Sequence, residues 1–204
     1  TKIMTKKPVV AAFDFDGTIT YRDTLLSFLI FTFGATKTYF KLMLELPWII
    51  GFLAGVIKRE DAKEHVLTRF FKGKNRLTLQ KFGNTFAHNA LHRHLRPQSL
   101  QRLHWHKKQG HRCILISASI DLYIEPWAKM MGFETALCTR LAYDVNKNAT
   151  GRIKGNNCWG PEKVERLTAY LGPRDAYTLY AYGDSRGDKE LLEFADHPYY
   201  RTME

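Results

Sequence analysis

Two aspartates stand two residues apart in the stretch AAFDFDGTIT, residues 11–20. The apolar residues before and between them predict a buried strand over residues 9–15, in which alternate side chains point to the same side. Asp14 and Asp16 would then project together beside Gly17, which permits a sharp turn. Adjacent carboxylates repel each other and lose hydration, so a cation or a shared proton would relieve them. The alternative is a pair of hydrated turn residues, because Asp-Gly is a common turn dipeptide.

Two further polar groups follow at positions where an anion could bind. Ser117-Ala118-Ser119 end the apolar run CILI, and a hydroxyl with free backbone amides could hold a phosphate oxygen there. Lys163 falls in the first turn of a helix that Pro161 is expected to begin. A cation at that end of a helix is unfavourable unless an anion lies beside it. The alternatives are an ordinary strand end and a lysine that points into water.

A second pair of aspartates occurs in GDSRGD, residues 183–188. Asp184 follows the apolar run YTLYAY, which predicts another buried strand, and Asp188 lies four residues further on. Asp188 is a candidate N-cap for the helix expected at DKELLEFA, since aspartate favours that position. This role is compatible with supporting a metal ligand.

Strands that alternate with helices position these groups and predict a parallel α/β sheet. The polar region YDVNKNATGRIKG predicts a hairpin after the third strand. From Asp23 to about Leu95 the residue pattern is typical of helices and contains no strand pattern. We therefore interpret this stretch as an insertion over one edge of the sheet. The expected strands cover residues 9–15, 113–117, 135–141 and 177–182, and the expected helices cover residues 98–109, 161–172 and 188–195.

The composition is typical of a globular protein. The 204 residues suffice for one core, or a core with a small insertion, and 45% of them are hydrophobic. The three cysteines, Cys113, Cys138 and Cys158, lack a framework spacing and favour a reducing cytosol over a disulfide scaffold. The first residues contain no apolar segment typical of a signal peptide, and Met4 is the expected natural start.

Positive charge is concentrated in one part of the chain. Between Gly34 and Arg112 there are 16 lysines and arginines against 4 acidic residues, a difference of +12, while the whole chain carries +11. Such a segment suits a phosphate compound, a nucleic acid or an anionic membrane, and hydrated helix faces are the alternative. Four histidines in this part of the chain occur in pairs two residues apart, a spacing that resembles that of metal ligands. Because residues i and i+2 diverge on a helix, we interpret them as surface residues: His92, His94, His104 and His106.

The order of the motifs resembles the haloacid dehalogenase superfamily of phosphohydrolases: DFDGT, a strand ending in SAS, a lysine at a helix start, and GDSRGD. The resemblance covers residues 9 to about 195. The stretches SASIDLYIEPWAKMMGFE and ATGRIKGNNCWGPEKVERL are similar to subfamily IB, which includes phosphoserine phosphatases and phosphatidylglycerophosphatase C-like members. The resemblance implies a Rossmann-like parallel-sheet core, residues 1–27 and 97–204, with a helical cap, residues 28–96, inserted after the first strand.

The resemblance also implies a role for each residue of the motifs. Asp14 would attack phosphorus to form an aspartyl-phosphate, and Asp16 would act as general acid and base. Mg²⁺ would be held by the Asp14 carboxylate, the Asp16 backbone carbonyl and Asp184. The other residues would support the metal or the phosphoryl group: Asp188 would orient Asp184 or a metal-bound water, Thr18 would support the first loop, and Ser117, Lys163 and the amide of Ala118 would hold phosphoryl oxygens.

Substrate choice is less closely defined. Phosphoserine phosphatases carry a Glu soon after the first motif and an Arg in the cap, and these grip the amino acid. Asp23 stands at about the Glu position, and no Arg aligns with the second, although Lys63 and Arg69 are nearby. This departure favours a phospholipid headgroup phosphate, such as that of phosphatidylglycerophosphate, over phosphoserine or another soluble phosphomonoester. A non-enzymatic module that binds anionic membrane or nucleic acid is the alternative of another class, although no recognisable RNA motif is present.

The insertion begins with two uncharged runs, residues 24–36 and 46–57, each too short to span a bilayer. Pro47 is expected to break the helix. The runs can form the core of a cap or a dimer face. They can also enter the headgroup region of a membrane while Lys and Arg meet anionic lipid. We therefore expect a cytoplasmic protein, with peripheral binding to the inner face of the membrane as the open alternative and no defined oligomeric state.

Overall fold

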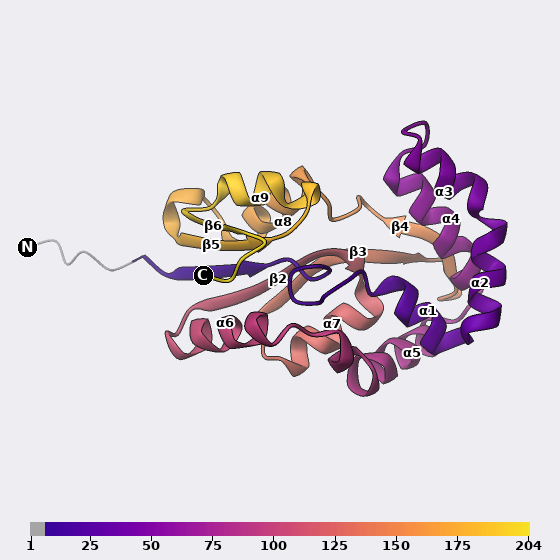
Figure 1. The fold of residues 1–204 in the computed structure, drawn as a ribbon, viewed down its shortest axis with the longest axis horizontal. Coiled ribbons are helices and arrows are strands. Elements are labelled where there is room, and N and C mark those ends of the chain that lie inside the picture. Colours follow the sequence, from indigo (N-terminus) through magenta and orange to yellow (C-terminus); the bar gives the residue numbers. More distant parts are fainter. Residues whose placement is uncertain (1–6) are drawn as a thin grey trace, which may run out of the picture.

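The computed structural model describes residues 7–204 and shows one α/β sheet covered by helices (Figure 1). Within these residues the sheet has six strands in the order β4-β3-β2-β1-β5-β6. Neighbouring strands are parallel except in the antiparallel β3–β4 hairpin. The predicted fold class is therefore confirmed. The strands are β1 Val9–Phe13, β2 Arg112–Ile120, β3 Thr135–Tyr143, β4 Ala149–Lys154, β5 Thr178–Gly183 and β6 His197–Tyr200.

Alternation along β1 divides the core between the two faces of the sheet. Val10 and Ala12 belong to one buried cluster, whereas Ala11 and Phe13 belong to the other. Figure 1 shows α8 and α9 on one side of the sheet and α6 and α7 on the other. Because both faces are covered, β1 is an almost continuous apolar run. The covering helices are α6 Pro97–Lys108, α7 Asp121–Met130, α8 Pro161–Leu171 and α9 Lys189–Phe194.

A helical segment follows β1 and lies at one end of the sheet (Figure 1). Its α5 packs against α7, and its α4 packs against β4. The contact with α7 is close, since a Cβ atom at Gly83 would come within 1.9 Å of the Leu122 carbonyl oxygen. The segment comprises α1 Leu25–Phe33, α2 Ala35–Leu44, α3 Leu46–Leu53, α4 Arg59–Phe71, α5 Arg76–Asn89 and the 3₁₀ turn Leu91–His94.

The predicted helix starts and ends at proline and glycine residues are confirmed. Pro161 lies in the first turn of α8, and Gly172 caps its end with a φ of 85°. Pro47 lies in the first turn of α3, so the helix does break between α2 and α3. The edge strand β6 was not predicted, because it is only four residues long and contains Pro198, which disfavours a strand. Met4, the expected start, lies outside the described residues.

The prediction that the four histidines are surface residues is wrong for His106. His92 and His104 are exposed and His94 is half-buried, but His106 is fully buried. It lies on the face of α6 that packs on the sheet, where its Nε2 is 2.8 Å from the Tyr182 hydroxyl. Its Nδ1 is 2.7 Å from Nδ1 of His111. Hydrogen bonds at both ring nitrogens satisfy the imidazole without a metal.

Candidate active site

The loop after β1 turns sharply at Gly17, whose φ is 83°. A Cβ atom there would lie 2.2 Å from Oδ2 of Asp184, so both conformation and space require glycine. The strand ends at Phe13, two residues earlier than predicted. Asp14 and Asp16 therefore reach the same cavity from a loop, and not through the alternation of a strand.

Asp14 is buried and lines this cavity. Lys163 Nζ donates to Asp14 Oδ1 at 2.6 Å, and the Thr18 hydroxyl donates to Oδ2 at 3.1 Å. Burial raises the pKa of the Asp14 carboxyl to about 7, against the opposing effect of the Lys163 charge. The position of Lys163 excludes the alternative of a lysine that points into water, since its side chain is only 2% exposed.

Asp16 has a separate set of partners. Its Oδ1 accepts from the Thr24 backbone N–H at 2.8 Å and from the Thr24 hydroxyl at 2.7 Å. Its Oδ2 accepts from the Ser119 hydroxyl. Burial raises the pKa of Asp16 to about 6, although these hydrogen bonds lower it. Neither contact was predicted from the sequence: Thr24 carried no signal, and Ser119 was noted only as part of the SAS motif.

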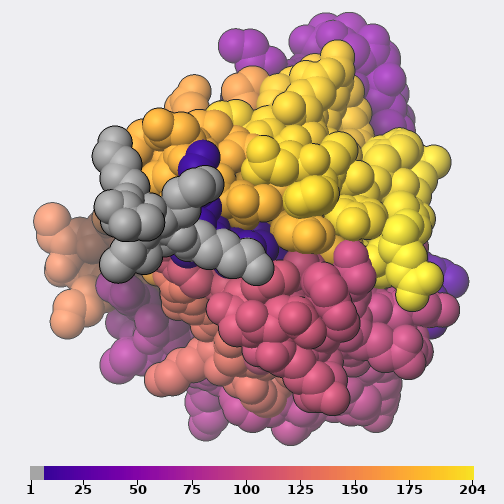
Figure 2. Space-filling view, turned by 90° about the vertical axis from the view of Figure 1, so that its left-hand side faces the viewer, coloured from indigo at the N-terminus to yellow at the C-terminus, as the bar shows by residue number. Residues whose placement is uncertain are grey.

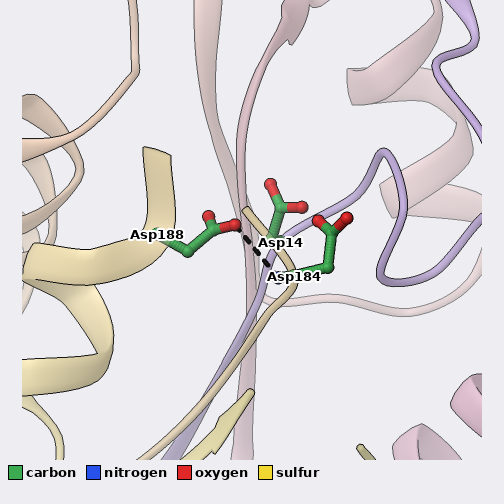
Figure 3. Close-up of side chains that lie close together, drawn as sticks. All are labelled: Asp14, Asp184 and Asp188. Atoms are coloured by element: carbon green, nitrogen blue, oxygen red, sulfur yellow. Dashed lines mark hydrogen bonds between the residues drawn. The ribbon is translucent and has the colours of Figure 1, made fainter. Parts of the chain in front are cut away.

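Three carboxylates from two loops converge beside the cavity. Oxygen atoms of Asp14, Asp184 and Asp188 lie within 4.8 Å of one another, and Figure 3 shows Asp14 between Asp188 on the left and Asp184 on the right. Lys163 Nζ also donates to Asp188 Oδ1 at 2.6 Å. The two buried carboxylates raise the pKa of Lys163 by more than burial lowers it.

Asp188 accepts hydrogen bonds from the loop after β5, which carries Asp184. Its Oδ2 accepts from the backbone N–H of Asp184 and of Ser185, both at 3.1 Å, and from the Ser185 hydroxyl at 3.0 Å. Asp188 does occupy the N-cap position of α9, but its side chain makes no cap hydrogen bond to that helix. The carboxylate instead fixes the loop that carries Asp184.

The acidic cluster has the chemistry of a site for a hard divalent cation. Burial and the charge of Asp188 raise the pKa of Asp184, whose carboxylate has only the Thr18 hydroxyl, at 3.4 Å, as a hydrogen-bond partner among the described residues. Lys163 neutralises one of the three charges. Oxygen-only donors suit Mg²⁺ better than zinc or copper. The side chains of Asp14 and Asp184 could therefore hold Mg²⁺, while Asp188 fixes the loop that carries Asp184.

The remaining predicted residues lie on the wall of the same cavity, which has a volume of about 680 Å³. Ser117 is buried, and its hydroxyl accepts from the Ser119 backbone N–H at 3.0 Å. Ser117, Ala118 and Lys163 all line the cavity beside Asp14. The structure thus brings together residues that are separated by up to 170 positions in the chain, from Asp14 to Asp184.

The far end of the cavity is formed partly by the helical segment. Lys63 of α4 donates to the Ala118 carbonyl and, at 2.9 Å, to Asn157 Oδ1, and burial lowers its pKa to about 8. Asp23 also lines the cavity. Its carboxylate accepts a hydrogen bond from the Leu25 backbone N–H at 2.9 Å. Arg69 does not line it, because it pairs with Glu45 at 2.5 Å. Residues not foreseen from the sequence complete this end: Leu25, Ile49, Phe52, Arg59, Val66, Tyr123, Asn157 and Trp159.

Comparison with known proteins agrees with this arrangement. The family model for haloacid dehalogenase-like hydrolases matches residues 11–193. Protein CicA of Caulobacter vibrioides is 32% identical over 200 residues, which cover 98% of this chain and 89% of that protein. A probable phosphatase of Mycobacterium tuberculosis is 26% identical over 193 residues, which cover 92% of this chain and 66% of that protein.

Solved structures show the same fold. A protein of unknown function from Bordetella pertussis superposes with a TM-score of 0.80 at 24% identity, covering 95% of this chain and 89% of that one. A substrate-bound phosphoserine phosphatase superposes with a TM-score of 0.63 at 15% identity, covering 96% of this chain and 87% of that one.

Proposed function

Because this chain belongs to the haloacid dehalogenase-like hydrolases, we propose that it hydrolyses phosphomonoesters through an aspartyl-phosphate on Asp14. The observation that carries the proposal is the position of the Asp14 carboxylate. It is buried, lines a cavity, and is held by Lys163 and Thr18, and Asp16 lines the same cavity. The relative named a probable phosphatase supports the same reaction.

In the proposed reaction, an oxygen of Asp14 forms a bond to phosphorus while the ester P–O bond breaks. Asp16 gives its proton to the leaving oxygen, and its raised pKa keeps part of the population protonated near neutral pH. Asp16 then accepts a proton from water, which attacks phosphorus and releases phosphate from Asp14. Lys163 holds Asp14 in place and offsets negative charge. Mg²⁺, held by Asp14, Asp184 and the Asp16 backbone carbonyl, would neutralise charge on the phosphoryl oxygens.

The direct test is phosphate release from an activated aryl phosphate, with Mg²⁺ and with excess chelator. We expect turnover only with the metal, and a phosphorylated protein when turnover is stopped with acid. Peptide mapping should place the phosphoryl group on Asp14. No hydrolysis by the wild-type protein with Mg²⁺ would contradict the proposal.

We also propose that residues 28–96 act as a cap on a core made of residues 1–27 and 97–204, the subfamily IB arrangement. Residues of α3 and α4, including Phe52, Arg59 and Lys63, supply one wall of the cavity, while the loops after the strands supply the other. The phosphoryl group would bind at the core wall. The cap wall would therefore contact the rest of the substrate and select it.

For the substrate we propose an amphiphilic phosphomonoester, such as a phospholipid with a terminal headgroup phosphate. The cap wall supports this, since Ile49, Phe52 and Val66 give it an apolar lining with Arg59 and Lys63 beside them. A small soluble ester such as phosphoserine is the second candidate, supported by Asp23 on the cavity wall. A panel of phosphatidylglycerophosphate, lysophosphatidate, phosphoserine and generic esters separates the two. A preference for phosphoserine would contradict the lipid assignment.

We propose, finally, that α3 contacts an anionic membrane from the cytoplasmic side. None of the residues of α3 is buried, and Leu53 and Val56 are 75% and 83% exposed. Lys37, Lys41 and Lys58 lie in the flanking sequence, so positive charge accompanies the apolar surface. No helix among residues 7–204 is both long and apolar enough to cross a bilayer. The three cysteines are buried and unpaired, which is consistent with a reducing compartment. We expect no nucleic-acid partner.

A further inference from the structure

A second cleft, of about 580 Å³, lies between α6 and the C-terminal segment. In Figure 2 this segment (yellow) adjoins the α6 region (pink). Tyr21 lines both this cleft and the active-site cavity, so the two are neighbours. We call it the arginine cleft, because its wall contains Arg96, Arg102 and Arg201.

Each of these guanidinium groups is anchored through its Nε atom. Arg96 Nε donates to the Thr20 carbonyl at 3.1 Å, and Arg201 Nε donates to the Asp184 carbonyl at 2.9 Å. Arg102 Nε donates to a tyrosine hydroxyl at 2.7 Å. For Arg96 and Arg201 this anchor leaves both Nη atoms to bind an oxyanion, which a guanidinium does in bidentate geometry. Arg102 offers only Nη1, because its Nη2 donates to the Tyr199 hydroxyl at 3.3 Å.

Each of the three guanidinium groups also lies over an aromatic ring. The guanidinium carbon lies 5.5 Å from the ring centroid of Tyr21 for Arg96, and 4.3 Å from that of Trp105 for Arg102. Arg201 lies 5.0 Å from the ring of a third aromatic residue, Tyr200. The ring contacts and the Nε anchors restrict these side chains, so an anion that binds them removes less rotamer entropy.

The three arginines lack a carboxylate partner within residues 7–204. Arg174 provides a contrast elsewhere in the molecule. It also lies over an aromatic ring and donates through Nε to a carbonyl, that of Phe194, yet it pairs with Asp196 at 2.6 Å. Glu204 lines the arginine cleft but forms no ion pair with the arginines in the described part of the chain. Within these residues the three arginines therefore form no direct ion pair, although burial raises the pKa of the Asp184 carboxylate and the charges of Arg201 and Arg96 act on it to lower that pKa.

We propose that the arginine cleft is a second anion-binding site, which takes a small ligand with a multiply charged oxyanion of the phosphate class. Three guanidinium groups line one cavity, and its volume lies within the range of roughly 300–1,000 Å³ typical of ligand sites. The site is separate from the phosphoryl position at Asp14, because none of the three arginines lines the active-site cavity.

The anchors connect this site to both active-site loops. Arg96 holds the carbonyl of Thr20 in the loop after β1, and Arg201 holds the carbonyl of Asp184 in the loop after β5. On the same helix as Arg102, Ser99 donates to the Thr18 carbonyl at 2.7 Å. An anion bound by Arg96 and Arg201 together would fix the two loops relative to each other, so its binding regulates the placement of Asp14 and Asp184.

The test uses inorganic sulfate as the probe and follows the arginine Nε–H signals by NMR in Mg²⁺-free buffer. Chloride at equal ionic strength is the control. We expect sulfate to shift the signals of Arg96, Arg102 and Arg201 with one common dissociation constant, while the Arg174 signal stays in place. Absence of a sulfate-specific shift, or an equal shift at Arg174, would overturn the proposal.

Variants show where the sulfate binds. Arg201→Gln, an exposed position, should weaken sulfate binding at the remaining two arginines at least tenfold, and Arg96→Gln should do the same. Arg174→Gln should leave the constant unchanged. Shifts that persist unaltered in Arg201→Gln and Arg96→Gln would mean that sulfate acts elsewhere, and the proposal would be wrong. Since no hydrolysis is measured, the phosphatase proposal and this one can fail separately.

Discussion

At the scale of single residues, the balance of charge in the acidic cluster is the central feature. Lys163 lies 2.6 Å from both Asp14 and Asp188 and offsets part of their charge. Asp184 has no ion-pair partner among the described residues, and burial raises its pKa. Among these residues Asp184 therefore lacks a direct cationic partner at the place where a metal and a phosphoryl group would meet, although the charges of Arg201 and Arg96 act on it from further away.

Asp14→Asn should remove activity while the fold is retained. The amide is nearly isosteric with the carboxylate but is a far poorer nucleophile, so hydrolysis of an activated aryl phosphate should fall at least about a thousandfold. Circular dichroism checks the fold. Asp196→Asn, which breaks a surface ion pair with Arg174, is the control and should keep wild-type turnover. Near-wild-type hydrolysis by Asp14→Asn would refute the mechanism.

Asp16→Asn should show a loss that depends on the leaving group. General acid catalysis contributes about 10²–10⁴-fold when the leaving oxygen needs a proton. The loss should therefore be large for an alkyl phosphate and smaller for a nitrophenyl phosphate. A plot of log kcat against leaving-group pKa measures this, and its slope should be steeper in the variant. Equal losses across the series would assign the proton to another group.

Mg²⁺ should stabilise the protein as well as activate it. A ligand that binds only the folded state at about 100 times its dissociation constant adds about 2.7 kcal/mol. We expect a Mg²⁺-dependent rise in Tm that Asp184→Asn largely removes, together with loss of activity in excess chelator and recovery on adding Mg²⁺. Ca²⁺ should raise Tm but support little turnover, because its looser coordination misplaces the reacting groups. Full activity in chelator would exclude the metal site.

At the scale of elements, the loops that follow parallel strands carry the chemistry, and helices fix those loops from outside. The turn at Gly17 passes directly against Asp184 of the neighbouring loop. In the same loop after β1, the Thr18 carbonyl accepts a hydrogen bond from the Ser99 hydroxyl of α6. Small changes in either contact would move carboxylates that must be placed within tenths of an ångström.

Gly17→Ala should reduce activity more than its effect on stability suggests. Its φ of 83° is strained for alanine, and the new methyl group would collide with Asp184. Gly110→Ala is the matched control, with a φ of 72° and open space around it. Both variants should lose about 1 kcal/mol of stability by urea unfolding. Only Gly17→Ala should lose turnover and Mg²⁺ affinity, and equal turnover in the two variants would contradict the role of this contact.

His106 should make stability depend on pH. Burial, with the nearby His111 and Arg102, lowers its pKa to about 3, so the folded state holds it neutral. The unfolded chain protonates it below about pH 6.5 and binds more protons there, so the free energy of unfolding should fall as the pH falls from about 6.5 toward 3. The slope from this group is at most about 1.4 kcal/mol per pH unit. His106→Gln should flatten it in urea titrations at pH 5–7, whereas exposed His104→Gln should not. An unchanged slope in His106→Gln would contradict burial of a neutral ring.

At the scale of the whole molecule, the two apolar runs of the helical segment have different positions. Phe28 and Leu29 of the first run are buried in the core, so that run is largely internal packing. The second run forms α3 and the turn after it, and its apolar side chains remain at the surface. Ile49 and Phe52 on the same helix line the active-site cavity, so a lipid-bound α3 would place the cavity beside the membrane.

Vesicle co-sedimentation tests this arrangement. Binding should occur with anionic vesicles and not with neutral ones, and should weaken with salt, because each Lys or Arg near the surface adds about 1 kcal/mol that ions screen. The double variant Leu53→Ser and Val56→Ser should bind less while hydrolysing a small soluble ester normally. Leu77→Ser, an apolar residue 73% exposed on α5, is the control. No vesicle binding, together with efficient turnover of phosphoserine, would place the substrate in solution.

Sequence patterns alone predicted strands β1, β2, β3 and β5, the β3–β4 hairpin, the bounds of α6, α8 and α9, and the polar groups at the strand ends. Local rules suffice for these, because apolar runs, Pro161 and Gly172 act within a few residues of their own positions. The strand order, β6, and the bounds of α7 and of the helices between Asp23 and Leu95 came only from the structure. The tertiary structure alone decided which charges meet. Lys163 was ambiguous until Asp14 and Asp188 lay on either side of it, and His106 was misplaced because burial depends on what packs against a helix. The arginine cleft could not be foreseen either, since its three members come from segments that only folding brings together.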